Sequence, residues 1–113
     1  MSRRASGLKA WVVQRVTAVY LALFGTYLAL AFVFAPPADH AALVDWVTGP
    51  WVMLGLLVLI PVLLAHAWVG IRDLFMDYLQ PIGARVLALS LVAFLFLASG
   101  LWAVQALIVA RIA

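Results

Sequence analysis

One stretch of the sequence gathers most of the side chains that could do chemistry. The residues from Leu63 to Pro81 read LLAHAWVGIRDLFMDYLQP, so a histidine stands inside an apolar run and is followed by charged residues and a tyrosine. His66 lies six residues before Arg72, which at the rise of an α-helix is about 9 Å from the end of the apolar run. An ionisable side chain this far inside an apolar segment is costly and needs a specific role.

Three interpretations of His66 follow from its position. It is a metal ligand, a member of a proton relay, or a neutral imidazole bonded to a neighbouring helix. Gly70 follows one turn later on the same helix face and leaves a surface that a flat macrocycle could approach, although close helix packing requires the same glycine. The other histidine, His40, lies in a loop. A heme with two axial histidines would therefore be shared with another chain.

Arg15 stands at the start of the first apolar segment, after Gln14 and before Thr17. By depth it belongs to the same layer as His66, where a guanidinium can hold a carboxylate such as a heme propionate through two hydrogen bonds. The alternative is an arginine that extends along the apolar surface to lipid phosphates.

Asp77 and Tyr78 follow His66 by eleven and twelve residues, at or just past the end of the same element. A phenol hydroxyl there can donate to a carbonyl oxygen on a lipid-soluble head group. The alternative is an interfacial tyrosine beside a solvated aspartate. Arg72 and Asp73 are adjacent, so we expect them on different helix faces, as surface charges that face a soluble partner.

The elements that must position these residues are membrane helices. Of the 113 residues 69% are hydrophobic and 10% are charged, proportions that indicate a lipid environment. Three apolar runs, approximately 12–35, 51–72 and 85–110, each reach the length of about twenty residues that crosses a bilayer. The sequence predicts an all-α membrane protein with three transmembrane helices in a single membrane-anchor domain, 1–113. Pro61 predicts a kink in the second span.

The distribution of charge predicts the orientation. Basic residues precede the first span, the first loop contains Asp39 and Asp45 without a basic residue, and the second loop region contains Arg72 and Arg85. By the positive-inside rule the amino terminus is cytoplasmic and the carboxyl terminus periplasmic. The first loop, with its prolines, is expected to be a short polar connection with one helical turn. Tryptophans at the expected span edges are interpreted as membrane anchors: Trp11, Trp46 and Trp51.

Several classes of function are excluded by what the sequence lacks. There is no cysteine, which excludes disulfides, iron–sulfur ligation and thiol catalysis. The loops are too short for a catalytic domain and contain no Ser/His/Asp set, phosphate-binding glycine loop or paired metal motif. The net charge of +3 lies mostly at the amino terminus, so it indicates topology and not binding to nucleic acid. Inward-facing polar residues are expected to meet a partner subunit or a cofactor.

These residues resemble a known family. The segment HAWVGIRDLFMDYLQP is similar to the part of the smaller hydrophobic membrane-anchor subunit of bacterial succinate dehydrogenase that carries the heme histidine and the quinone tyrosine. The stretch QRVTA, from Gln14 to Ala18, resembles that family's first-span opening. The chain length, the three spans and the cytoplasmic amino terminus are also similar.

The resemblance implies a role for each candidate residue. His66 would be one axial ligand of a b-type heme, the other histidine belonging to a second hydrophobic anchor subunit, and Arg15 would lie near a heme propionate. Tyr78, with Asp77 beside it, would form part of the ubiquinone site next to the iron–sulfur subunit. Succinate oxidation would take place in a flavoprotein subunit, and the complex would lie in the bacterial inner membrane.

Two alternatives remain beside this interpretation. One is the anchor of a quinol-oxidising fumarate reductase. The embedded His66 favours a heme-containing succinate dehydrogenase over this alternative. The other is a small structural or accessory membrane protein with no redox role, in which Arg15, His66 and Tyr78 would be incidental. The sequence departs from the family in its charged Arg72 and Asp73, where uncharged residues are expected, and this affects the contact with the soluble subunits.

Overall fold

Four helices make up residues 3–112, the part of the chain that the computed structural model describes, with side chains described from residue 7. They are α1 (Arg3–Phe34), α2 (His40–Val47), α3 (Pro50–Tyr78) and α4 (Ile82–Ile112), and no strand occurs among these residues. α1, α3 and α4 are each long and apolar enough to cross a membrane. The prediction of an all-α membrane protein with three spanning helices is confirmed.

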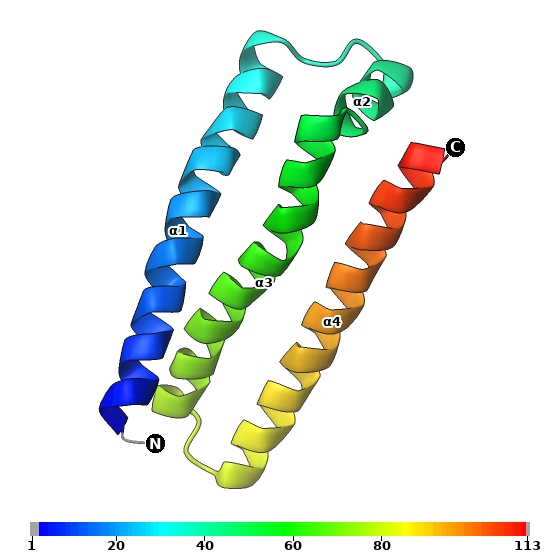
Figure 1. The fold of residues 1–113 in the computed structure, drawn as a ribbon. Coiled ribbons are helices and arrows are strands. Elements are labelled where there is room, and N and C mark those ends of the chain that lie inside the picture. The colour runs from blue at the N-terminus through cyan, green and yellow to red at the C-terminus, as the bar shows by residue number, and fades with distance from the viewer. Residues whose placement is uncertain (1–2, 113) are drawn as a thin grey trace.

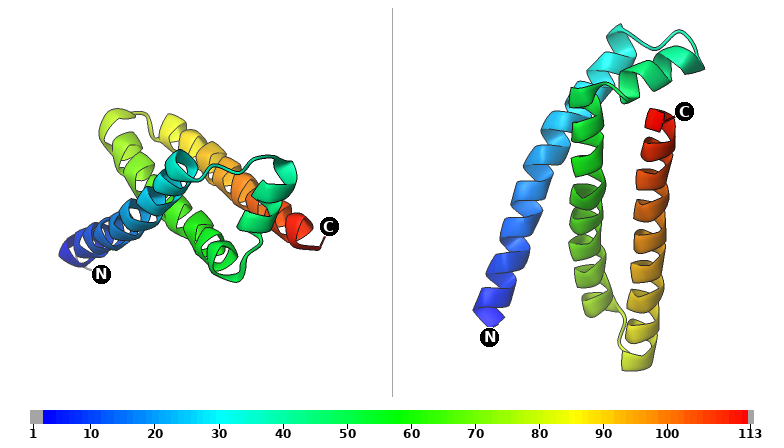
Figure 2. Two further views of the ribbon diagram at one scale, coloured as in Figure 1. Left: turned by 90° about the horizontal axis from the view of Figure 1, so that it is seen from above. Right: turned by 45° about the vertical axis from the view of Figure 1, so that its right-hand side comes forward.

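α3 is the central helix of the molecule (Figures 1 and 2). It packs against both α1 and α4, whereas α1 and α4 do not approach each other closely within residues 3–112. The start of α1 and the α3–α4 turn lie at one end, and α2 and the end of α4 lie at the other. Because two of the three long helices meet only the third, few residues in the described part are buried: Thr17, Met53, Val69 and Gly100.

Each long helix extends beyond the apolar run from which it was expected. α1 begins well before residue 12, α3 continues past residue 72 to Tyr78, and α4 begins at Ile82. Hydrogen bonds within the helix satisfy the backbone equally well in lipid and in the interfacial region, so the helix does not end where the apolar side chains end. Pro61 lies inside α3 without dividing it into two helices.

The connection between the first two spans is more ordered than expected, because α2 has eight residues, about two turns, where one turn was predicted. Its start is capped by Asp39, whose backbone is extended and whose carboxylate accepts a hydrogen bond from the Ala42 N–H at 2.8 Å. At its end the Thr48 hydroxyl donates to the Val44 carbonyl at 2.7 Å. The acidic residue read as loop charge is therefore a helix cap.

The contact between α1 and α3 is built around Gly55. The Tyr20 hydroxyl donates to the Gly55 carbonyl at 2.6 Å, and the Phe24 ring, stacked on Tyr20 with 5.7 Å between ring centroids, occupies the space that a side chain at Gly55 would need. On the other side of α3, a Cβ at Gly100 of α4 would lie 2.6 Å from Leu64 Cδ1. Glycines thus allow close approach at both interfaces of α3.

The tryptophans differ in their surroundings. Trp46 of α2 packs edge-on against Phe32 of α1, with 5.3 Å between ring centroids, and so connects α2 to the first span. Trp11 and Trp51 are exposed, by 57% and 82%.

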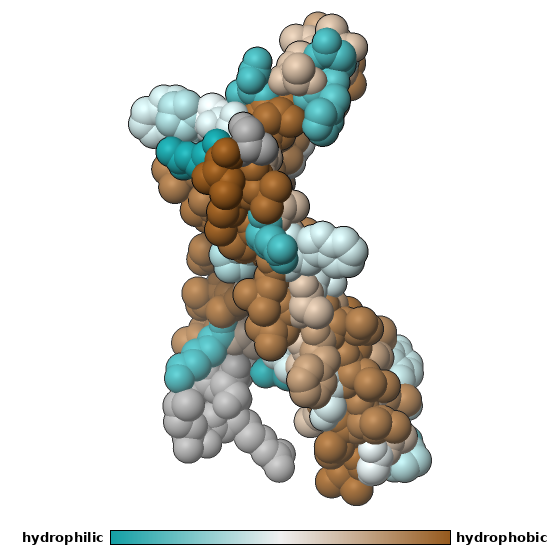
Figure 3. All heavy atoms as spheres, turned by 90° about the vertical axis from the view of Figure 1, so that its right-hand side faces the viewer, coloured by the Kyte–Doolittle hydropathy of each residue, from teal (hydrophilic) through white to brown (hydrophobic). Residues whose placement is uncertain are grey.

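Hydrophobic residues cover most of the middle of the face in Figure 3, and many hydrophilic residues gather at the end that carries α2. This distribution is typical of a helical membrane protein.

Candidate functional site

His66 lies on the side of α3 that faces α1. Its ring is half-buried, and its Nδ1 atom is 3.0 Å from the hydroxyl oxygen of Thr17 on α1. Thr17 is 8% exposed and is the one buried polar residue among those whose side chains are described. Its hydroxyl also lies 2.6 Å from the Val13 carbonyl oxygen and 3.2 Å from the Gln14 carbonyl oxygen. The histidine is therefore held by a hydrogen bond between two helices, and none of the hydrogen bonds found in residues 7–112 involves its Nε2 atom.

The surface beside His66 is open at Gly70. A Cβ at Gly70 would meet a single neighbour within 4 Å, Gln14 Nε2 at 3.8 Å, which is an ordinary contact. Gly70 is exposed, in contrast to the packing glycines Gly55 and Gly100, whose Cβ positions are taken by other side chains. Close packing within this chain therefore does not require Gly70. The explanation of Gly70 by close helix packing thus has no support in contacts among the described residues.

Gln14 presents a polar group next to this open surface. Its Oε1 atom is buried and has no hydrogen-bond partner among the described residues. A buried amide oxygen without a donor is uncommon, because losing water without replacement costs about 1–3 kcal/mol. The residue marks a place where a polar group from outside this chain would be accommodated.

Arg15 is exposed on α1, and no hydrogen bond among the described residues joins it to His66. Its guanidinium carbon is 5.3 Å from the ring centroid of Trp11, one turn earlier. Within the described residues no hydrogen bond or ion pair joins Arg15 to another side chain. A contact with an indole face leaves guanidinium N–H groups available for an anion.

Asp77 and Tyr78 are the last two residues of α3, and both are exposed, Tyr78 by 75%. The end of α3 is held by Arg85 at the start of α4. Its Nε donates to the Leu79 carbonyl and its Nη2 to the Met76 carbonyl, both at 3.1 Å. These bonds satisfy carbonyls that a helix end leaves free and fix the turn beside Tyr78. Arg85 was read from the sequence only as a topology signal.

Arg72 and Asp73 are exposed, as expected of surface charges, and they are also paired with each other. Arg72 Nη2 lies 3.2 Å from Asp73 Oδ1, and both side chains are largely exposed to solvent, by 42% and 58%. The arginine side chain is long enough to bridge the angle of about 100° between adjacent helix positions. Such an exposed pair contributes little to stability.

The predicted residues thus form two groups along α3. His66, Gly70 and the two α1 residues Gln14 and Thr17 form the first, while Asp77 and Tyr78 form the second, about 17 Å further along the helix axis at 1.5 Å per residue. No group of three or more His, Cys, Asp or Glu side chains among the described residues is arranged to hold a metal ion. A metal centre at His66 therefore needs ligands from outside this chain.

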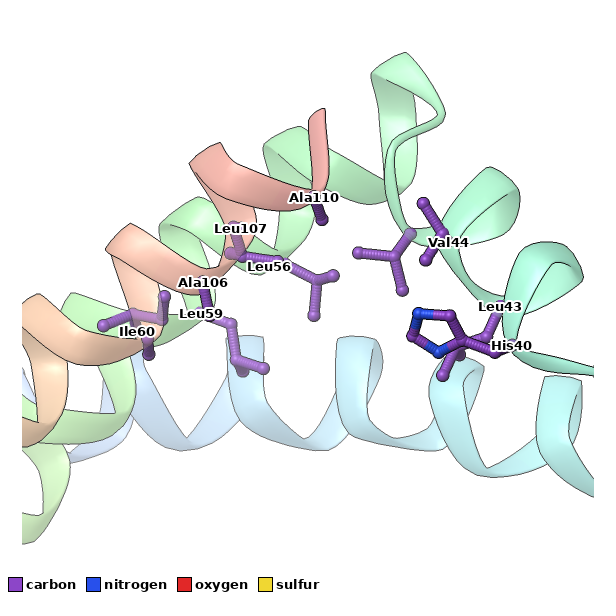
Figure 4. Close-up of a pocket in the computed structure, with 11 residues that line it drawn as sticks. His40, Leu43, Val44, Leu56, Leu59, Ile60, Ala106, Leu107 and Ala110 are labelled. Atoms are coloured by element: carbon purple, nitrogen blue, oxygen red, sulfur yellow. The ribbon is translucent and has the colours of Figure 1, made fainter. Parts of the chain in front are cut away.

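Sequence reasoning missed Thr17 as a site residue. A hydroxyl in an apolar helix at the same depth as an embedded histidine was the available signal, but the contact between two residues 49 positions apart in the sequence could not be predicted from it. A separate cavity of about 420 Å³ lies between α2, α3 and α4 at the other end of the molecule (Figure 4). His40 lines it together with aliphatic side chains, and none of the predicted site residues takes part.

Comparison with known proteins gives the family of the chain. A family model described as succinate dehydrogenase/fumarate reductase transmembrane subunit matches residues 1–102. The chain belongs to this family. It is also 27% identical over 110 residues to the succinate dehydrogenase hydrophobic membrane anchor subunit of Coxiella burnetii (strain RSA 493 / Nine Mile phase I), an alignment that covers 97% of this chain and 94% of the relative.

Membership in the succinate dehydrogenase/fumarate reductase family makes the chain a membrane-anchor subunit that works with other subunits of such a complex. With three spanning helices it is a multi-pass protein of the bacterial inner membrane. An accessory membrane protein outside redox complexes, the third interpretation of the sequence, is thereby set aside.

Proposed function

We propose that residues 1–113 form one anchor domain of a succinate dehydrogenase, in which His66 supplies one axial ligand of a shared b-type heme and Tyr78, with Asp77, forms part of the ubiquinone site. The observation that carries the proposal is the arrangement at His66: a half-buried imidazole, bonded through Nδ1 to Thr17, beside a glycine that packing does not require. The family description includes fumarate reductases as well, and the embedded histidine favours the heme-containing succinate dehydrogenase.

The residues around His66 fit a heme. Bonding of Nδ1 to Thr17 leaves Nε2 as the ring nitrogen for a metal. Gly70, one turn away, adds no side chain of its own to the adjoining surface, and Gln14 Nε2, 3.8 Å from the Gly70 Cβ position, offers N–H donors there. A heme bound by His66 would supply one-electron exchange within the membrane. The second axial histidine would come from the second hydrophobic anchor subunit.

Arg15 would hold a propionate of that heme. Its guanidinium is exposed and its one described side-chain contact is with the face of Trp11, so its N–H groups remain available for a carboxylate. The alternative, an arginine directed to lipid phosphates, uses the same exposed position. Removing the charge separates the two, because a propionate contact affects the heme and a lipid contact does not.

Tyr78 would donate a hydrogen bond from its hydroxyl to a carbonyl oxygen of ubiquinone. In support, Tyr78 is exposed at an end of α3 that Arg85 fixes, so a lipid-soluble ring and water could both reach its phenol. Negative charge develops on the carbonyl oxygen as the quinone is reduced, and the bond strengthens with it. Asp77 beside it offers a carboxylate at the same boundary.

The orientation in the membrane follows from charge. The basic amino-terminal segment, Arg72 and Arg85 all belong to the end that carries the amino terminus and the α3–α4 turn (Figure 1). By the positive-inside rule this end is cytoplasmic and the carboxyl terminus is periplasmic. The quinone site would then face the iron–sulfur subunit, which with the flavoprotein subunit would lie on the cytoplasmic side.

Replacement of the histidine tests the proposal. In the assembled complex, His66→Ala should lower or abolish the b-heme signal in the reduced-minus-oxidised spectrum, because it removes a ligand without reducing the hydrophobicity of α3. His40→Ala, at the exposed histidine of α2, is the matched control and should leave the spectrum unchanged. A wild-type spectrum and midpoint potential for His66→Ala would show that His66 is not a ligand.

A further inference from the structure

Thr17 has one hydroxyl proton and three polar neighbours. Two are backbone carbonyl oxygens, of Val13 at 2.6 Å and of Gln14 at 3.2 Å, and the third is Nδ1 of His66 at 3.0 Å. A carbonyl oxygen accepts and never donates. Two oxygens 2.6 Å apart need a proton between them, so the hydroxyl donates to the Val13 carbonyl.

This assignment determines the direction of the bond to the histidine. With its proton directed to Val13, the Thr17 oxygen can only accept, and the proton in the 3.0 Å contact belongs to Nδ1 of His66. Thr17 is 8% exposed, so water competes little for these positions. A neutral imidazole with its proton on Nδ1 has its free lone pair on Nε2.

The position of the hydroxyl is itself held by the helix. A threonine that bonds back to the carbonyl four residues earlier has a restricted χ1 angle. The oxygen of Thr17 is therefore aimed at α3 by α1, and the direction of the imidazole plane depends on it. A series of hydrogen bonds thus crosses the interface of the two helices, from the His66 ring through the Thr17 hydroxyl to the Val13 carbonyl.

We propose that Thr17 is a positioning residue for the heme: by accepting from Nδ1–H of His66 it selects the tautomer that ligates through Nε2 and sets the orientation of the ring. The inference rests on the proposed function of His66. Accepting a hydrogen bond from Nδ1–H would also increase electron donation by the ring, which would favour the ferric over the ferrous state of a bound heme.

The test compares three variants in membranes that contain the assembled complex. Thr17→Val removes the hydroxyl and keeps the shape, Thr17→Ser keeps the hydroxyl, and Thr48→Val is the matched control. Thr48 makes the same bond to the carbonyl four residues earlier, at 2.7 Å, and the structure records no bond from it to an imidazole. The measurements are the b-heme midpoint potential, the electron paramagnetic resonance g values of the ferric heme, and heme content per complex.

For Thr17→Val we expect a higher midpoint potential, altered g values and about tenfold weaker heme retention, the lower end of the usual loss when a partner of a ligating histidine is removed. Thr17→Ser and Thr48→Val should match the wild type. A Thr17→Val complex with wild-type potential, g values and heme content would overturn the inference, and so would a Thr17→Ser complex that differs as much as Thr17→Val.

Two further comparisons keep the result interpretable. If Thr17→Val does not assemble, Thr17→Ala is compared with Thr17→Ser: heme restored by serine alone supports the inference, and equal heme in both overturns it. His66→Ala distinguishes a failure of the positioning role of Thr17 from a failure of the ligand assignment of His66. Loss of heme in His66→Ala with an unaffected Thr17→Val refutes only the positioning role, whereas unaffected heme in His66→Ala refutes the ligand assignment itself.

Discussion

Gly70 provides the sharpest test of whether the surface beside His66 receives a group from outside the chain. A Cβ at this position meets only Gln14 Nε2, at the ordinary distance of 3.8 Å. Within the chain, replacement of a glycine inside a helix by alanine should therefore stabilise α3 by about 0.5–1 kcal/mol. If a heme covers this surface, a larger side chain must displace it.

The expected magnitude for Gly70→Leu follows from overpacking. Forcing extra methylene groups into a filled contact costs about 1–3 kcal/mol, which corresponds to roughly 5- to 140-fold weaker heme binding at 1.4 kcal/mol per factor of ten. The assay is transfer of heme from the solubilised complex to excess apomyoglobin, with membrane insertion of the chain followed in parallel. Insertion should be unaffected.

Gly25→Leu is the matched control for this experiment, because a Cβ at Gly25 of α1 would meet no atom within 4 Å and one at Gly70 would meet only Gln14 Nε2 at 3.8 Å. It should insert normally and retain heme. The reasoning is refuted if Gly70→Leu retains heme as the wild type does, because the cofactor would then not cover the open surface.

Two further predictions concern the remaining candidate residues. Tyr78→Phe should slow quinone reduction about tenfold or more, the loss of ~1.4 kcal/mol for one hydrogen bond to a developing anion, while succinate oxidation with an artificial acceptor upstream of the membrane is unchanged; wild-type quinone turnover would make Tyr78 an interfacial residue. Arg15→Leu should lower the heme midpoint potential, because removing a nearby positive charge favours the ferric state. Arg111→Leu, at the far end of α4, should leave the potential unchanged. An unchanged potential in Arg15→Leu would indicate that Arg15 contacts lipid and not a propionate.

The three spans could be predicted because each is a property of one continuous segment. An apolar run of sufficient length forms a helix in lipid whatever it packs against, and a single histidine inside such a run is visible from the sequence alone. α2 was underestimated because its stability depends on a cap, Asp39, that resembles an ordinary acidic loop residue. A helix cap formed by a single side chain is easily mistaken for an ordinary polar loop residue.

The contacts between helices could not be predicted in the same way. The pairing of Thr17 with His66 and of Phe24 with Gly55 depends on the register at which α1 crosses α3. With apolar residues on every face of the helix, periodicity does not define which face turns inward. For the same reason the sequence could not distinguish Gly70 from the packing glycines, because which glycine lies in a helix contact also depends on that register.

The geometry of α3 keeps the two proposed sites, at His66 and at Tyr78, apart along one helix. His66, Gly70 and Asp77 share one face, because spacings of four and eleven residues are near whole numbers of turns, whereas Tyr78 lies about 100° further round. The axial separation of about 17 Å between His66 and the end of the helix is too great for direct contact between the two groups. Changes at Tyr78 should therefore alter quinone turnover and leave the heme potential unchanged, while changes at Thr17 should alter the potential first. If both variants altered both quantities equally, the two ends of α3 would act as one site, and the assignment of separate roles along the helix would be wrong.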